Sequence, residues 1–136
     1  MKQTRVLLAD ENTLMIERAR RLLETEFQIV AEVHDGYSLV RKALELKPDV
    51  AVIDIALPGC NGIEAAREIR KHHPEMKVIF LTMHQSAGLF EDALAMGCLG
   101  YVLKSCAASD LVAAVREALA GRSYLSPRAT STAQRK

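Results

Sequence analysis

The chain has 136 residues, 49% of them hydrophobic and 26% charged, and its formal net charge is +1. This length suits a single domain with one hydrophobic core. A nearly neutral charge gives no sign of a nucleic-acid-binding surface or of a groove for acidic substrates. No apolar run approaches the ~20 residues that a membrane-spanning helix needs, so we expect no association with a membrane.

The cysteines are Cys60, Cys98 and Cys106. Their odd number and their spacing fit neither a disulfide scaffold nor a zinc site. We therefore expect reduced thiols and a cytoplasmic location.

Short apolar runs alternate with amphipathic patterns along the chain. Strands are predicted at residues 6–9, 27–33, 50–54, 78–81 and 99–103, and helices at 14–23, 39–46, 63–73, 89–96 and 108–120. Asn12 or Thr13 is the candidate N-cap of the first helix, and Gly97 and Gly121 are candidate C-caps of the last two. Five strands alternating with five helices predict an α/β fold, a parallel sheet with helices on both faces.

A change of composition marks the C-terminal end of this pattern. From Ser126 onward there is no periodic apolar face and no acidic residue. We expect a domain over residues 1–121, followed by a flexible tail or truncated linker over 122–136.

One stretch, residues 49–59, places a single carboxylate at the end of a buried strand. Asp54 follows the apolar run 50–53, and Pro58 and Gly59 then open a loop. A carboxylate at such a place is costly unless it is neutralised, and ligands of open α/β sheets bind at the carboxyl ends of the strands. Taken alone, Asp54 fits an ordinary strand-terminal aspartate that caps a turn better than it fits a functional site.

Other strands end in polar groups as well. Asp10 and Glu11 follow the first strand, Thr82 ends the fourth and Lys104 follows the fifth. In a parallel sheet these groups share one edge with Asp54, where three carboxylates would repel one another unless a cation were present. An all-oxygen cluster suits Mg²⁺, and a lysine and a hydroxyl beside it suit a transferred phosphoryl group.

The chain resembles the receiver domains of two-component response regulators over about residues 4–121. The resemblance rests on the motifs at residues 8–11, 52–59, 81–82 and 100–105. It implies a flavodoxin-like, doubly wound sheet of five parallel strands in the order 2-1-3-4-5, with five helices.

The same resemblance implies a role for each matching residue. Asp54 would accept the phosphoryl group, while Asp10, Glu11, Asp54 and the Ala56 carbonyl would hold Mg²⁺. Lys104 would pair with the phosphoryl oxygens and Thr82 would donate a hydrogen bond to them. Tyr101 would switch its ring between outward and inward positions. The implied partner is a histidine kinase or a phosphotransfer protein, and the chain would be a signalling receiver with slow autodephosphorylation rather than an enzyme.

The fifth helix and residues 121–127 resemble the NarL/FixJ (LuxR-type) regulators more narrowly. In that group a linker leads to a C-terminal helix-turn-helix domain, so transcription control, DNA binding through that missing domain and a homodimer formed on phosphorylation are implied. A stand-alone receiver, acting in a phosphorelay or by protein binding, remains an alternative.

The sequence fits two other classes of protein less well. An aspartyl-phosphate phosphatase of the haloacid dehalogenase type is disfavoured, because Ala56 stands where a second aspartate is expected. A nucleotide-binding flavodoxin or Rossmann protein is disfavoured, because no glycine-rich phosphate loop follows the first strand.

The chain departs from the usual receiver pattern at three positions. Glu11 replaces an aspartate and would alter the geometry around Mg²⁺, whereas Leu57 replaces a methionine without consequence. Met83 stands where a small residue is common, and we expect it to crowd the phosphoryl site and change reaction rates.

Several remaining features have plain interpretations. His34, His72, His73 and His84 do not form a metal-binding pattern, and Cys60 is interpreted as a bystander thiol near the site. The apolar residues of the predicted fourth helix, Leu89, Phe90, Leu94 and Met96, fit either the core or a partner-binding face that the family forms with this helix, the fifth strand and the fifth helix.

Overall fold

The computed structural model describes residues 3–83 and 87–125. The strands are β1 (Arg5–Ala9), β2 (Gln28–Val33), β3 (Val50–Asp54), β4 (Lys77–Thr82), β5 (Gly100–Leu103) and β6 (Tyr124–Leu125). The α-helices are α1 (Thr13–Leu23), α2 (Gly36–Leu46), α3 (Gly62–His72), α4 (Ala87–Ala95) and α5 (Ala107–Leu119), and a short 3₁₀ helix, η1 (Lys104–Cys106), precedes α5.

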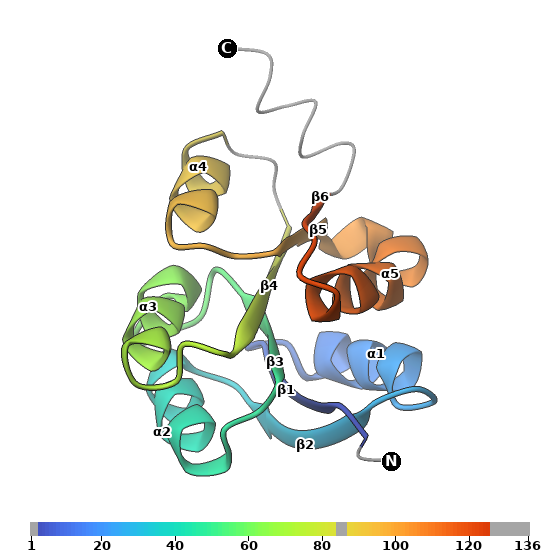
Figure 1. Cartoon of the computed structure of the whole chain (residues 1–136), viewed down its shortest axis with the longest axis horizontal. Coiled ribbons are helices and arrows are strands. Elements are labelled where there is room, and N and C mark those ends of the chain that lie inside the picture. Colours follow the sequence, from blue (N-terminus) through green and yellow to red (C-terminus); the bar gives the residue numbers. More distant parts are fainter. Residues whose placement is uncertain (1–2, 84–86, 126–136) are drawn as a thin grey trace.

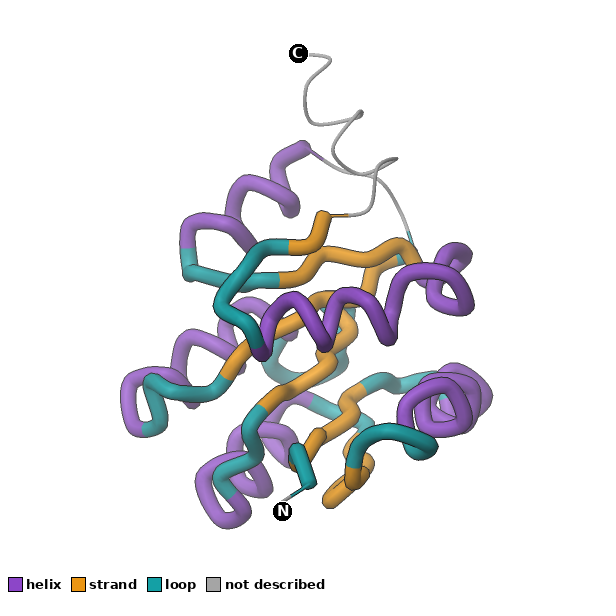
Figure 2. Tube along the Cα trace, turned by 45° about the vertical axis from the view of Figure 1, so that its right-hand side comes forward, coloured by secondary structure: helices purple, strands orange, loops and turns teal. Residues whose placement is uncertain are grey.

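The strands form one parallel sheet between two layers of helices. The sheet has six strands in the order β2-β1-β3-β4-β5-β6, and every pairing in it is parallel. Helices α1 and α5 cover one face, and α2, α3 and α4 cover the other (Figures 1 and 2). The predicted fold class and the strand order 2-1-3-4-5 are confirmed.

The number of strands in the sequence-based prediction was wrong by one. Residues 124–125, expected to lie in the tail, pair with β5 as the edge strand β6. Two residues are too short to show the alternation by which strands are recognised in a sequence. The described chain therefore stays attached to the sheet as far as Leu125, and the part of the predicted tail at 126–136 lies outside the described residues.

The ends of the helices follow local capping chemistry. Asn12 is the N-cap of α1, as expected, and its side chain accepts hydrogen bonds from the Leu14 and Met15 amides. Helix α2 begins earlier than the predicted residue 39, because Asp35 is its N-cap and accepts a hydrogen bond from the Ser38 amide. Gly97 has a positive φ of 91°, which suits the left-handed end expected after α4.

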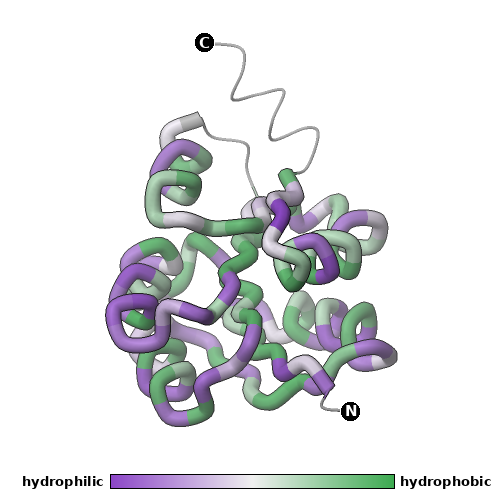
Figure 3. Tube along the Cα trace, in the orientation of Figure 1, coloured by the Kyte–Doolittle hydropathy of each residue, from purple (hydrophilic) through white to green (hydrophobic). Residues whose placement is uncertain are grey.

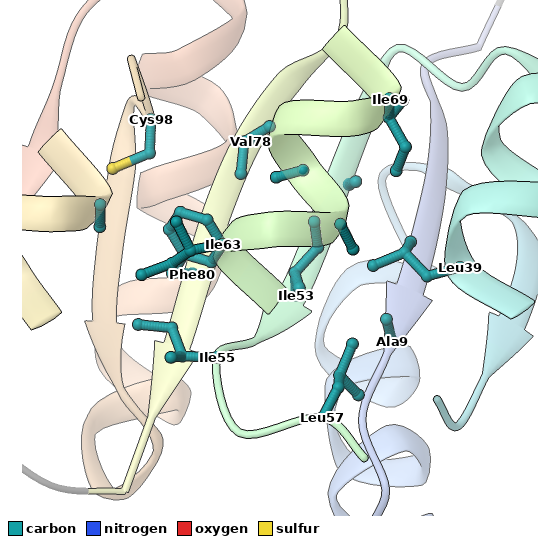
Figure 4. Packing of buried hydrophobic residues seen from close by; sticks show 14 of the residues in the cluster. Ala9, Leu39, Ile53, Ile55, Leu57, Ile63, Ile69, Val78, Phe80 and Cys98 are labelled. Atoms are coloured by element: carbon teal, nitrogen blue, oxygen red, sulfur yellow. The ribbon is translucent and has the colours of Figure 1, made fainter. Parts of the chain in front are cut away.

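Each face of the sheet has its own apolar core. One cluster joins β-strand side chains to α2, α3 and α4, and the other joins them to α1 and α5. Figure 4 shows the first cluster, in which Ile63 of α3 lies close to Phe80 of β4, with Ile53 of β3 nearby. All five residues of β3 are buried, and Figure 3 shows the apolar strands inside a more hydrophilic layer of helices.

Over residues 3–83 and 87–125, no helix is both long and apolar enough to cross a lipid bilayer.

Candidate functional site

The predicted site residues meet at the carboxyl edge of the sheet because the strands that carry them are parallel. Asp10 follows β1, Asp54 ends β3, Thr82 ends β4 and Lys104 begins η1 after β5. They line a cavity of about 510 Å³ together with Glu11, Asn12, Ile55, Ala56, Met83 and Leu89. The polar residues predicted to gather at the carboxyl edge of the sheet thus do so in the folded chain.

Lys104 links the two buried carboxylates. Its Nζ lies 2.8 Å from Asp10 Oδ2 and 3.2 Å from Asp54 Oδ2. Asp10 is 2% exposed and Asp54 is 5% exposed. Two carboxylates thus share one ammonium group, which leaves an uncompensated negative charge in a poorly solvated place when both are ionised.

The pKa of Asp54 reflects this imbalance. Burial raises the pKa of Asp54 above its usual range, and the neighbouring Asp10 carboxylate raises it further. The Lys104 ammonium and the Ala56 amide lower it, but by less. The free energy of this carboxylate would therefore fall if a cation or a covalent group removed its charge.

Backbone amides fix the orientation of both carboxylates. The Asn12 N–H donates to Asp10 Oδ1 at 2.8 Å, and the Ala56 N–H donates to Asp54 Oδ1 at 3.1 Å. Gly62, at the start of α3, allows the close packing beneath β3, because a Cβ there would clash with the Asp54 carbonyl. One oxygen of each carboxylate is thus held by the backbone and the other points to Lys104.

Thr82 and Tyr101 lie on adjacent strands next to this cluster. Thr82 is 5% exposed and lines the cavity. Tyr101 is fully buried, and its ring meets Phe90 of α4 edge-to-face at a centroid distance of 4.9 Å. The ring is therefore in the inward position in this structure.

The Tyr101 hydroxyl has an unfavourable environment. It makes no hydrogen bond of normal geometry with the described residues. Burial raises the pKa of Tyr101, although the nearby Thr82 hydroxyl partly offsets this. The inward ring thus combines good apolar packing with a poorly satisfied polar group, which costs about 1–3 kcal/mol.

Glu11 and Met83 lie at the rim of the cavity. Both are exposed, and Met83 is 69% exposed. Within the described residues, no three histidine, cysteine, aspartate or glutamate side chains are close enough together to hold a metal ion. The structure brings Asp10 and Asp54 together as predicted, but it leaves the Glu11 carboxylate apart from them.

This donor set still fits Mg²⁺. That ion usually takes one or two carboxylates and keeps several waters, and Asp10 and Asp54 supply two hard oxygen ligands with excess negative charge. The 510 Å³ cavity leaves room for water on the exposed side. The ligand set Asp10, Glu11, Asp54 and the Ala56 carbonyl therefore stays a prediction, in which Glu11 would have to act from the rim of the cavity.

Sequence reasoning gave other roles to two residues that border the site. Asn12 was expected only as a helix cap, yet its backbone N–H also orients Asp10. The sequence signal for this contact was an aspartate two positions before an N-cap residue. Leu89 of α4 lines the cavity, and only the packing of α4 against the sheet brings it there.

Two histidine rings bond backbone carbonyls, and the three cysteines form no disulfide. The His34 ring bonds the Asp10 carbonyl and the His73 ring bonds the Pro48 carbonyl, while His84 lies outside the described residues. All three cysteines are unpaired, and burial raises the pKa of Cys98 to about 12. Burial and nearby glutamates raise the pKa of Cys60 too, which disfavours a reactive thiolate beside the site.

Comparison with known proteins gives a consistent family. The model of the response regulator receiver domain matches residues 6–116. The transcriptional regulatory protein DegU of Brevibacillus brevis is 34% identical over 127 residues, which are 92% of this chain and 54% of DegU. This chain thus spans about half the length of that relative.

Solved structures agree with the sequence comparison. A two-component response regulator of the LuxR family from Aurantimonas sp. SI85-9A1 is 36% identical, with a TM-score of 0.91 and coverage of 98% of this chain and 96% of that one. The isolated receiver domain of RcsB from Salmonella enterica serovar Typhimurium, solved with the phosphomimetic BeF₃⁻, is 25% identical, with a TM-score of 0.88 and coverage of 96% and 99%.

Proposed function

The chain belongs to the response regulator receiver family, and from that premise we propose that Asp54 accepts a phosphoryl group from the phosphohistidine of a kinase or phosphotransfer protein. An Asp54 oxygen attacks phosphorus and the phosphorus–nitrogen bond breaks. The electron pair of that bond stays on the histidine nitrogen, and the imidazole leaves as a neutral ring after taking a proton from water. The observation that supports this most is the position of Asp54. It lies on a cavity that admits a phosphoryl group, beside Lys104 and Thr82.

Lys104 and Thr82 have complementary roles in this proposal. Phosphoryl transfer depends mostly on positioning and on neutralising charge around the equatorial oxygens. The Lys104 ammonium, now shared between Asp10 and Asp54, would follow the charge onto the phosphoryl oxygens. The Thr82 hydroxyl would donate a hydrogen bond to another of them.

Mg²⁺ would be held by Asp10, by Asp54 and by the Ala56 carbonyl, with Glu11 acting from the rim. When bound, it would neutralise the charge on the incoming phosphoryl group and on the two carboxylates. The Asn12 backbone N–H already orients Asp10 for this, and the excess negative charge of two carboxylates that share one ammonium group favours the approach of a cation.

Phosphorylation would become a signal through Tyr101. Movement of Thr82 toward the phosphoryl group would make more room for the inward ring, which packs on Phe90 of α4. The new charge would thus favour one packing of α4 and β5 over another.

The output that we propose is transcription control through a DNA-binding domain beyond the part of the protein given by this chain. The name of DegU and the coverage of 54% of its length support this. Reading the gene past residue 136 tests it, because a stand-alone receiver would have no helix-turn-helix there.

The phosphoacceptor role is tested by intact mass after incubation with acetyl phosphate and Mg²⁺. We expect a gain of one phosphoryl group in the wild type, none in Asp54→Asn, and an undiminished gain in Asp92→Asn, which changes an exposed aspartate on α4. EDTA should abolish the gain. A wild-type mass shift in Asp54→Asn would place the acceptor elsewhere.

A further inference from the structure

Strand β6 occupies the edge of β5 between two helices. It lies between α4 and α5 at one side of the sheet (Figure 1). Tyr124 pairs with Gly100 and Leu125 pairs with Tyr101, and the Tyr124 amide donates to the Leu99 carbonyl at 2.7 Å. The segment that follows α5 is therefore attached to the same strand that carries the Tyr101 ring.

The two residues of β6 pack on opposite faces. The Tyr124 side chain packs with the α1–α5 core, and its hydroxyl donates to Asp110 Oδ1 of α5 at 2.9 Å. Leu125 packs against the core cluster that contains Tyr101 and Phe90. The turn before β6 is further tied to α5 by Arg122, whose Nε lies 2.7 Å from Glu117 Oε1.

Leu125 occupies the space beside the Tyr101 ring. The two residues are direct neighbours on paired strands, about 4.8 Å apart along the hydrogen-bonding direction, and their side chains lie on the same face. A Tyr101 ring that turned outward over the edge of β5 would meet Leu125. The outward ring and the docked strand thus compete for one place.

The inward ring is not strongly favoured by its own contacts. Its hydroxyl lacks a well-formed hydrogen bond within the described residues, and water would satisfy that hydroxyl if the ring turned outward. Leu125 adds apolar contact on the inward side, which offsets part of this cost. Docking of β6 and burial of the ring therefore stabilise each other.

We propose that β6 is a latch that docks on β5 only while the Tyr101 ring is inward, so that the position of the ring decides whether the segment after α5 is held or released. Its control by phosphorylation rests on the proposed function, since Asp54 would act on the ring through Thr82. The docked latch also fills the β5 edge of the α4–β5–α5 face, so a partner that needs this edge must wait until β6 leaves.

The latch is tested first without any phosphoryl analogue, on the whole chain labelled with 3-fluorotyrosine. The chain has three tyrosines, so Tyr→Phe variants assign their fluorine signals. We expect Leu125→Asp to move the Tyr101 signal toward that of exposed Tyr37 and to speed exchange of the Tyr124 amide by on the order of tenfold or more. Leu14→Asp, at a 75% exposed site on α1, should change neither.

If docking of β6 and burial of the Tyr101 ring are linked, a change that loosens the ring must also loosen β6. Phe90→Ala, which removes the ring partner of Tyr101, should speed Tyr124 exchange more than that of Val52 in central β3, which serves as the reference for global unfolding. Tyr124→Phe, which removes only the bond to Asp110, should give a smaller increase and keeps the test open if Leu125→Asp does not fold. Loss of Tyr124 protection with an unmoved Tyr101 signal would overturn the latch.

Control by Asp54 is tested separately with beryllofluoride and Mg²⁺. We expect slower Tyr124 exchange in the wild type and no response in Asp54→Asn. If the latch variants behave as expected but beryllofluoride binds without slowing Tyr124 exchange, control by Asp54 is overturned while the latch itself stands. If beryllofluoride fails to bind, the proposed phosphoacceptor function is what fails.

Discussion

Helices α5 and α4 lie on opposite sides of β5 but are held very differently. Helix α5 buries a continuous face, made by Ala107, Asp110, Leu111, Ala114, Val115 and Ala118. Among residues 88–95 of α4, only Phe90 and Ala93 are buried, while Leu89 and Leu94 are 37% and 40% exposed. A helix with few buried contacts opens at lower free energy than the rest of the fold, so α4 is the element suited to move and α5 the one suited to support it.

A substitution in the buried face of α5 is expected to have the largest effect on stability. Leu111 is fully buried, so Leu111→Ala should lower the free energy of unfolding of the whole domain by about 3 kcal/mol. Urea denaturation measures it. Leu119→Ala, at a 38% exposed position of the same helix, should cost less than about 1 kcal/mol; similar losses at the two positions would mean that α5 does not anchor the fold.

The next effect concerns the C-terminal end of α4. Arg70 of α3 donates to the carbonyls of Met96, Gly97 and Pro74 at 3.1–3.3 Å. Arg70→Met should remove these charge-assisted bonds and lower the local opening free energy of α4 by about 2 kcal/mol. Hydrogen exchange of the Met96 amide measures this.

Arg67→Met is the matched control for Arg70. Arg67 lies one turn earlier on α3 and makes an exposed pair with Glu64 at 3.5 Å, which is worth little. The comparison between the helices would fail if Arg67→Met loosened α4 as much as Arg70→Met does.

A smaller effect is expected where α4 meets β5. Phe90→Leu keeps the site apolar but removes the edge-to-face contact with Tyr101, which is worth about 1 kcal/mol. We expect faster exchange of the α4 amides and little change in the urea midpoint. Phe80→Leu, at a fully buried residue of β4, should instead lower the urea midpoint. A drop of equal size for Phe90→Leu would show that α4 unfolds only with the whole domain.

The smallest expected effect is the change in stability with pH that is caused by Asp54. Because the pKa of Asp54 is raised in the folded chain, the native state holds its proton to higher pH than the unfolded state does. Stability therefore falls as pH rises through that raised pKa. Asp54→Asn should raise the free energy of unfolding at neutral pH by less than about 1 kcal/mol, and the melting temperature with it. This advantage should vanish as the pH falls to the usual pKa range of an aspartate side chain.

Melting curves of Asp54→Asn and wild type at several pH values check this sign. An advantage of the variant that persisted at acidic pH would have another origin than the charge of Asp54. Lys104 keeps its 2.8 Å partner Asp10 in either protein, so the ammonium group is not left alone by the substitution.

The sequence by itself determined the order of the elements and the edge on which the site lies. Apolar runs such as residues 50–53 bury on both faces only in a parallel sheet covered by helices, and parallel strands bring their carboxyl ends to one edge. The meeting of Asp10, Asp54, Thr82 and Lys104 follows from that rule, because each of these residues ends or follows a strand.

Only the tertiary structure decided the contacts that depend on side-chain reach and on short segments. The sharing of Lys104 between two carboxylates, the exposed position of Glu11 at the rim, and the entry of Leu89 into the cavity depend on how helices pack and on which rotamers fit. Strand β6 was hidden for a different reason: its two residues form a strand because β5 offers an open edge and α4 and α5 offer contacts on either side, and none of these is local to residues 124–125.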